Sequence, residues 1–209
     1  MAGNGGVPEW RKHLQPCEWL KTDGNCYISL PYMVNDINLF KIKYSATTNT
    51  TVFGCYIGNP KYHFFSQQIL ENKLYTRLFV PNINSQRVSD YIFGTDIELL
   101  FDKNARKYAI NGVKFSVNYT YASDLNYNLY IFGLIKDLNV IVPATNGLII
   151  YNCETNLFNL IAAYVIDEYT DNKGNLCSSG VAGMVDILSG VFYTNDGTGT
   201  FSHGGDIEI

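Results

Sequence analysis

Three short segments between residues 95 and 119 alternate apolar and polar side chains, and this period of two constrains the fold more than any other feature. Along residues 96–101 and again along 113–119, every second position is apolar, as expected of strands with one buried and one wet face. Between residues 108–110 and the last segment stands Asn111-Gly112, which is typical of a type I′ hairpin turn because both central residues take a positive φ. Three consecutive antiparallel strands are therefore predicted.

Other parts of the chain show the same short, turn-separated pattern. Residues 40–44 alternate aromatic or aliphatic side chains with lysine, residues 127–133 predict a further strand, and residues 147–153 predict a short, fully buried one. Residues 157–169 are almost continuously apolar, so a helix and a pair of buried strands both fit them. Aromatic residues make up 14% of the chain, which favours half-buried pleated surfaces. Without βαβ alternation, the pattern indicates an all-β sandwich of two antiparallel sheets.

Length and charge narrow the class of protein further. The chain has 209 residues, of which 46% are hydrophobic and 16% charged, so it is expected to fold as one large domain. Its net charge of -4 gives no basic field for nucleic acid, and no apolar run reaches the length of a membrane helix. The start of the chain lacks the apolar core of a secretory signal. We therefore expect synthesis in a reducing cytoplasm and neither a nucleic-acid nor a membrane partner.

Residues 1–16 differ in composition from the rest and are predicted to form a flexible N-terminal arm, with the sandwich domain covering residues 17–209. The arm carries a cluster of aromatic and basic residues that we expect to bind a partner, because tryptophan and arginine are typical interface anchors: Trp10, Arg11, Lys12 and His13. The alternative is a frayed chain end without a partner.

The titratable residues do not form a catalytic pattern. Asp96 and Glu98 share one strand face, but that face is opposite the apolar one, so we expect it to point to solvent rather than to form a glycanase pair. His13, His63 and His203 are far apart in the sequence, and the five cysteines show no CxxC spacing. The sequence therefore predicts no enzyme, no metal site and no cofactor.

The most specific motif lies near the C-terminus. Residues 181–201 read VAGMVDILSGVFYTNDGTGTF, a strand, a Ser-Gly turn, an aromatic strand and a glycine-punctuated return. This segment resembles the C-terminal signature of the concanavalin A-like, laminin-G-like jelly-roll domains of tailed-phage virion proteins and gut-bacterial surface proteins. Residues 18–28, 96–112 and 130–132 resemble further segments of that family, so the likeness covers most of residues 18–203. The sequence departs from the pattern at Met184 and along residues 154–180.

The resemblance implies a concanavalin A-like jelly-roll sandwich whose motif residues have structural roles. The turn glycines Gly197 and Gly199 are expected to take positive φ, and the aromatic residues to fill or cover the core. The structural motif residues are Phe192, Tyr193, Asn195, Gly197, Gly199 and Phe201.

The family also implies a function and a place of synthesis, the cytoplasm of the bacterial host. We expect a non-enzymatic structural protein of a bacteriophage virion, exposed as a capsid-associated decoration, head-fibre or tail component and docked partly by its arm. Its partners would be other virion proteins, in a homo-oligomer or lattice. The alternative is a carbohydrate-binding adhesion module, for which a Tyr/Asn-rich segment supplies candidate glycan contacts. A glycanase is the least supported hypothesis. The candidates are Tyr119, Tyr121, Asn126, Tyr127 and Asn128.

Overall fold

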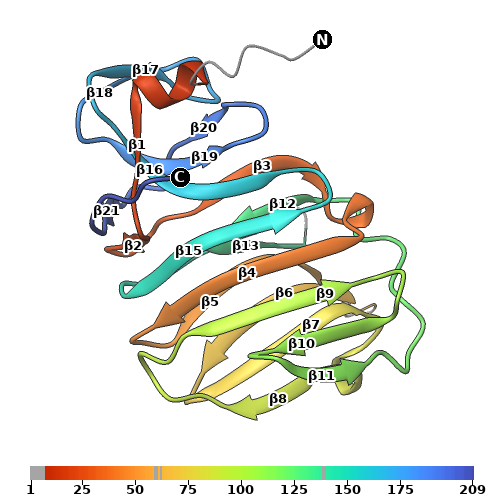
Figure 1. Ribbon diagram of the computed structural model, residues 1–209. Helices are drawn as coiled ribbons and strands as arrows, with labels where there is room; N and C mark the ends of the chain where they lie inside the picture. The colour runs from red at the N-terminus through yellow and green to blue at the C-terminus, as the bar shows by residue number, and fades with distance from the viewer. Residues whose placement is uncertain (1–7, 59–60, 62, 138–139) are drawn as a thin grey trace.

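The computed structural model describes residues 8–58, 61, 63–137 and 140–209, and these residues form two facing β-sheets (Figure 1). The main path of the larger sheet consists of β11 (Val113–Ser116), β10 (Lys107–Ile110), β9 (Ile97–Asp102), β4 (Leu39–Ala46), β15 (Leu148–Thr155), β16 (Asn159–Val165), β19 (Ala182–Asp186) and β20 (Phe192–Tyr193). Three short strands from the chain ends join it: β1 (Leu14–Pro16) pairs with β16, and β2 (Leu20–Thr22) pairs with β15 and with β21 (Phe201–His203).

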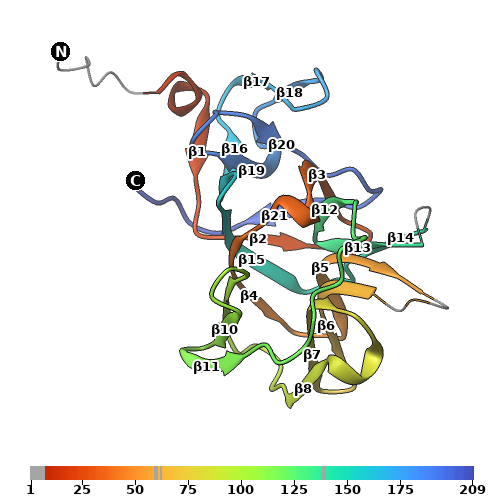
Figure 2. The same ribbon diagram turned by 90° about the vertical axis from the view of Figure 1, so that its right-hand side faces the viewer.

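The smaller sheet faces the part of the larger sheet that contains β4 and β9 (Figure 2). Its main path runs through β14 (Val140–Pro143), β13 (Gly133–Lys136), β5 (Thr50–Ile57), β6 (His63–Leu70), β7 (Lys73–Val80) and β8 (Arg87–Asp90). β12 (Asn128–Ile131) pairs with β5 and with β3 (Ile28–Met33). Neighbouring strands run antiparallel in both sheets, except that β13 lies parallel to β5. The all-β prediction of two antiparallel sheets in a sandwich-like arrangement is confirmed.

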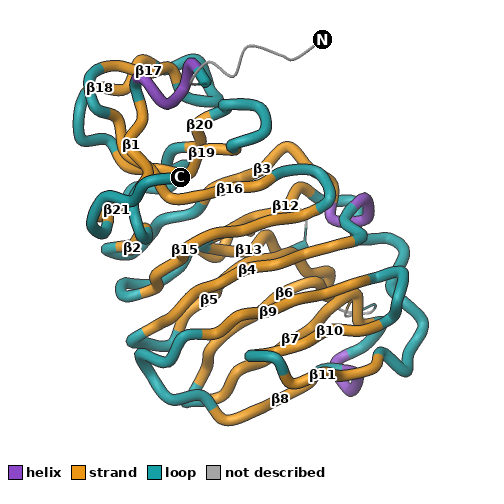
Figure 3. Tube along the Cα trace, in the orientation of Figure 1, coloured by secondary structure: helices purple, strands orange, loops and turns teal. Residues whose placement is uncertain are grey.

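The remaining elements are short (Figure 3). A two-stranded sheet joins β17 (Glu168–Thr170) to β18 (Leu176–Ser178), and three 3-10 helices are η1 (Glu9–Lys12), η2 (Val34–Asp36) and η3 (Ile83–Ser85). No α-helix occurs in the part of the chain that the structure describes. Within the same residues, no helix has the length and apolar character needed to cross a membrane.

The core lies between the two sheets and follows from the alternation of the strands. In β4, Phe40 and Ile42 are buried, whereas Lys41 between them is partly exposed. The Phe40 ring lies 4.6 Å from Phe53 and 5.4 Å from Phe65 of the smaller sheet, measured between ring centroids. Such aromatic pairs contribute about 1 kcal/mol each beyond the burial of their area. Aromatic contacts across the layers therefore hold the sheets together.

A second, smaller core lies at the end of the larger sheet, and it changes the interpretation of the N-terminus. Trp10 and Leu14 are 5% and 1% exposed, and they pack with Val165, Val185 and Phe192. β1 also pairs with β16. Residues 9–16 thus belong to the folded body, which differs from a flexible arm extending to residue 16. The first seven residues of the predicted arm lie outside the described residues.

Secondary-structure predictions were correct where the residues of a turn are diagnostic, and less accurate in long apolar segments. Asn111 and Gly112 have φ of 48° and 78°, which confirms the hairpin between β10 and β11. The ambiguous residues 157–169 form β16 and the start of β17, so the helix interpretation was wrong. Of residues 147–153, all but Gly147 lie in β15, but Ile149 and Tyr151 are partly exposed because only one face of that strand packs inward. The fully buried strand predicted there was therefore wrong as well.

Candidate functional site

The C-terminal motif closes the fold by holding backbone groups from the N-terminal part of the chain. The Asn195 carboxamide oxygen accepts hydrogen bonds from the N–H of Tyr27 at 3.0 Å and of Gly197 at 2.9 Å. Its Nδ2 donates to the carbonyl of Gly199 at 2.6 Å. One side chain thus fixes both its own turn and the loop that precedes β3.

Gly197 and Gly199 are required because the backbone passes so close to them. A Cβ on Gly197 would lie 1.9 Å from the carbonyl oxygen of Asn25, and one on Gly199 would lie 1.8 Å from that of Gly24. Neither glycine has a positive φ. The predicted structural role therefore has a different physical reason: close approach of two segments, not left-handed backbone.

Two carboxylates complete this contact between the chain ends. The N–H of Thr200 donates to Asp23 at 2.8 Å, and the N–H of Ser29 donates to Asp196 at 2.8 Å. Hydrogen bonds from Thr200 hold the pKa of Asp23 below its ordinary value. We call Asp23, Asn195, Asp196, Gly197 and Gly199 the clasp.

The motif's aromatic residues lie next to the clasp and support it. Phe192 and Tyr193 are 0% and 2% exposed, and the half-buried Phe201 ring lies 4.6 Å from that of Phe132. They fill or cover the core as the sequence predicts.

Of the predicted partner-binding cluster, Trp10 faces its own chain, Arg11 and His13 are partly exposed, and Lys12 is exposed. Trp10 is buried, and the Arg11 guanidinium lies over its ring at 5.7 Å. Lys12 pairs with Glu9 at 2.6 Å, and His13 Nδ1 lies 3.0 Å from Asp167 Oδ1. These contacts tie η1 to the turn after β16, and Trp10 is not presented to a partner.

The predicted glycan-binding segment is divided between the core and the surface. The Tyr119 hydroxyl donates to the carbonyl of Leu78 at 2.9 Å, and burial raises its pKa. Tyr121 packs on Phe79 of the smaller sheet and Phe101 of the larger one, which closes one rim of the sandwich.

The rest of that segment is more accessible. Asn126 is exposed and accepts a hydrogen bond from Asn35 at 2.7 Å, while Tyr127 and Asn128 are partly buried. The five residues therefore do not present one continuous stacking surface for a sugar.

Asp96, just before β9, and Glu98, within it, are paired with lysines on the outer face of the larger sheet. Lys43 Nζ lies 3.3 Å from Asp96, and Lys41 Nζ lies 3.3 Å from Glu98. The Tyr151 hydroxyl also donates to Asp96 at 2.9 Å. In the described ranges, no cluster of three or more His, Cys, Asp or Glu side chains is placed to hold a metal ion.

A hollow of about 460 Å³ lies on the same side of the larger sheet, where β4, β9 and β10 run together. The exposed side chains of Leu39 and Leu100 border it, as do Lys107 and Lys114. Its aromatic lining residues include Phe40 and Phe101, which belong to the core. The hollow is therefore apolar with a basic rim and offers few exposed rings.

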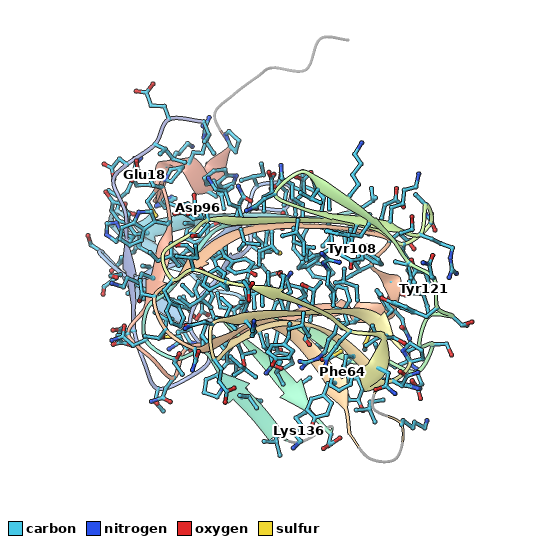
Figure 4. The ribbon with its side chains drawn as sticks, turned by 90° about the horizontal axis from the view of Figure 1, so that it is seen from below. Glu18, Phe64, Asp96, Tyr108, Tyr121 and Lys136 are labelled. Carbon is cyan, nitrogen blue, oxygen red and sulfur yellow. The ribbon has the colours of Figure 1, made fainter. Side chains whose placement is uncertain are left out.

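The outer face of the smaller sheet carries a row of rings and cations that sequence reasoning missed. Lys136 Nζ lies 5.4 Å from the Tyr56 ring centroid, and the Tyr56 ring stacks on Phe64 with centroids 4.9 Å apart. The Arg77 guanidinium lies 5.0 Å from Phe64 and 5.1 Å from Tyr75. We call these five residues the Arg77 face. Figure 4 shows Phe64 and Lys136 on the side of this sheet that points away from the larger one.

Arg77 is the buried cation of this face. It is 7% exposed, its Nε donates to Gln86 at 2.7 Å, and its Nη1 donates to the side-chain oxygen of Gln68. Burial lowers the pKa of its guanidinium. No carboxylate of the described residues forms an ion pair with it. The face therefore holds a buried cation whose partners are neutral amides and rings.

A sequence signal for this face existed in the segment 74–78. Leu74, Thr76 and Leu78 point inward, so Tyr75 and Arg77 share the outer face. The contribution of Tyr56, Phe64 and Lys136 depends on how β13, β5 and β6 pair, which one strand's alternation does not reveal.

Comparison of the chain with protein-family models finds no match, and a search of the curated proteins finds none either.

Proposed function

We propose that this chain is a non-enzymatic structural protein of a tailed-phage virion, built on a concanavalin A-like jelly roll and exposed as a capsid-associated decoration, head-fibre or tail component. The observation that carries the proposal is the clasp. The residues on which the family resemblance depends, Asn195, Gly197 and Gly199, are all used to join the two ends of the chain. A motif with this role belongs to a self-contained module that presents its surfaces to neighbours.

The structure assigns Trp10 to the module itself, so docking must use other residues of the N-terminal segment. Trp10 and Leu14 are part of the second core, so they anchor the N-terminal segment to the module itself. We propose that residues 1–7, together with the basic side chains of Arg11 and Lys12, provide the contact with other virion proteins.

Mass spectrometry of gradient-purified virions tests the virion role. We expect the protein in the particles, with hundreds of copies for a capsid decoration and about a dozen or fewer for a tail or portal component. Virions that lack the protein would overturn the proposal. Deleting residues 1–7 removes none of the described residues of the second core, so this variant tests docking with those residues in place. Unchanged incorporation of the shortened chain would remove the docking mechanism.

A second candidate function is adhesion to glycans, and the Arg77 face is the observation that favours it. Rings on an outer sheet face are suited to stack on sugars, and amide and cationic groups beside them are suited to bind hydroxyl or acidic groups. The two functions are compatible, because an exposed virion protein can also bind a surface. A glycan array probed with the purified protein tests adhesion, and an array without bound glycans would contradict it.

A further inference from the structure

We propose that the Arg77 face binds acidic glycans, with the sugar carboxylate held by Arg77 and Lys136 and the sugar rings stacked against Tyr56 and Tyr75. The inference rests on the candidate adhesion function and names its site and ligand class. It concerns one surface of the described residues: the side of β13, β5, β6 and β7 that faces away from the larger sheet.

The charge of the face is the first argument. Arg77 has no carboxylate partner in the described part of the chain, although taking a guanidinium out of water is costly unless its charge is compensated. Beside Lys136 lies Asp137, whose carboxylate accepts a hydrogen bond from the N–H of Gly58. The centre of the face thus has a positive charge for which an incoming carboxylate is the complementary group.

The guanidinium is already oriented for such a group. Gln86 and Gln68 hold Nε and Nη1, and the rings of Phe64 and Tyr75 fix its plane. A planar guanidinium held in this way loses little conformational freedom when it binds a carboxylate. Nη2 forms no hydrogen bond with the described residues. This nitrogen is the donor that a ligand would use.

The aromatic rings of the face are the second argument for glycan binding. Tyr56, Tyr75 and Lys136 are partly exposed, whereas Phe64 is 6% exposed and supports them from within the row. Four adjacent strands span about 14 Å at their usual spacing, so the face fits a short oligosaccharide. The hollows of about 460 Å³ and 350 Å³ lie elsewhere on the molecule. A shallow open face suits an extended polymer better than a small molecule in a pocket.

The test measures binding of the full chain to oligomers of polygalacturonate and to polysialic acid, with dextran as the neutral probe, by calorimetry at low and at physiological salt. We expect binding to the acidic probes that weakens as salt increases, and none to dextran. Lys136→Gln should reduce the affinity about 5-fold, and Arg77→Gln by at least about 10-fold. Arg77→Lys keeps the charge but loses the planar donor, so its affinity should lie between wild type and Arg77→Gln.

Lys43→Gln is the matched control, because Lys43 lies over the Tyr151 ring at 4.6 Å on the outer face of the other sheet. It should leave binding unchanged, and thermal melting of each variant shows whether the fold is kept. If Arg77→Gln is unfolded, Lys136→Gln and Arg77→Lys decide the question. Equal loss in Lys43→Gln and Lys136→Gln, or binding of dextran alone, would overturn the inference and leave adhesion in place. No binding to any probe would overturn both, while virion mass spectrometry judges the structural role separately.

Discussion

The clasp and the Arg77 face both contain polar side chains, but these side chains have different kinds of partners. In the clasp, the side chains of Asn195 and Asp196 are satisfied by backbone groups of the same chain. On the Arg77 face, a more deeply buried cation is held by neutral partners, and its charge is left uncompensated by the described residues. The difference separates polar groups that close a fold from polar groups that remain free to bind.

The outer face of the larger sheet sharpens the contrast. Two of its lysines, Lys41 and Lys43, each lie 3.3 Å from a carboxylate: Glu98 in β9 and Asp96 just before it. Lys41 and Lys43 are thus compensated by carboxylates of their own chain, whereas Arg77 has no carboxylate partner among the described residues. We expect substitutions in the clasp to change stability, and substitutions on the Arg77 face to change binding.

The largest stability effect is expected at Gly199. Gly199→Ala places a methyl group 1.8 Å from the Gly24 carbonyl oxygen, so the two segments must separate, and we expect a loss of about 4 kcal/mol in the free energy of unfolding. Denaturant unfolding measures it. Gly174→Ala is the control, because Gly174 has a φ of 83° with open space around it, and should cost about 1 kcal/mol. Similar losses in both variants would show that close approach is not what the clasp requires.

A smaller effect is expected at Asp171, whose carboxylate joins the β17–β18 hairpin to the motif. It accepts hydrogen bonds from the N–H groups of Lys173 and Asn175 and from the hydroxyl of Thr194. Asp171→Asn should therefore cost about 2 kcal/mol near neutral pH. Denaturant unfolding near neutral pH measures this loss.

The same carboxylate predicts a pH dependence. Burial raises the pKa of Asp171, but the hydrogen bonds, chiefly from Asn175 and Thr194, outweigh it and leave the pKa below its ordinary value. Its ionised form therefore stabilises the fold above the unfolded pKa of about 3.9, and this contribution is lost as the pH falls through the folded pKa. Unfolding measured from pH 6 to pH 2 should show a steeper decline in wild type than in Asp171→Asn. Parallel curves would contradict this prediction.

Lys136→Gln and Lys43→Gln should both change the melting temperature by about 2 °C or less, because partly exposed cation–π contacts contribute little to stability. The two variants are expected to differ only in binding to acidic probes. A large loss of stability in Lys136→Gln alone would mean that the Arg77 face is a structural stack, and it would weaken the case for a ligand there.

The smallest effect is expected at Asp96, whose pair with Lys43 joins partly exposed side chains. Asp96→Asn should change the free energy of unfolding by about 0.5 kcal/mol or less. Chemical denaturation compared with wild type checks this value. A loss of several kcal/mol would show that the larger sheet depends on its outer charges more than its exposure indicates.

Sequence reasoning identified the elements whose signal is local. The period of two in residues 96–101 and the Asn111-Gly112 turn each specify a conformation within a few residues. The apolar run around Ala162 and Ala163 did not, because a strand packed on both sides has no polar face to show its period. Trp10 was interpreted as an interface anchor because local sequence does not show its contacts. The pocket that buries it is built by β16, β19 and β20, far along the chain.

The Arg77 face required the pairing of strands, which is a property of the whole sheet. Tyr75 and Arg77 are adjacent in the sequence pattern, but Lys136 reaches Tyr56 only because β13 lies parallel to β5 across a long connection. The need for glycine at position 199 likewise depends on a distant neighbour, the backbone of Gly24. Residue types alone therefore identified the motif, whereas the reason for its glycines and the site on the smaller sheet needed three-dimensional neighbours.

The pairing of β2 with β21 also determines when this chain can finish folding. Leu20 to Thr22 take partners from β15 and from residues 201–203, so β2 cannot complete its pairing before these distant residues have been synthesised. Its first partner arrives late, and the last one arrives near residue 203. A chain that ends before β21 would leave β2 with an exposed edge, which makes such fragments prone to aggregation and to proteolysis.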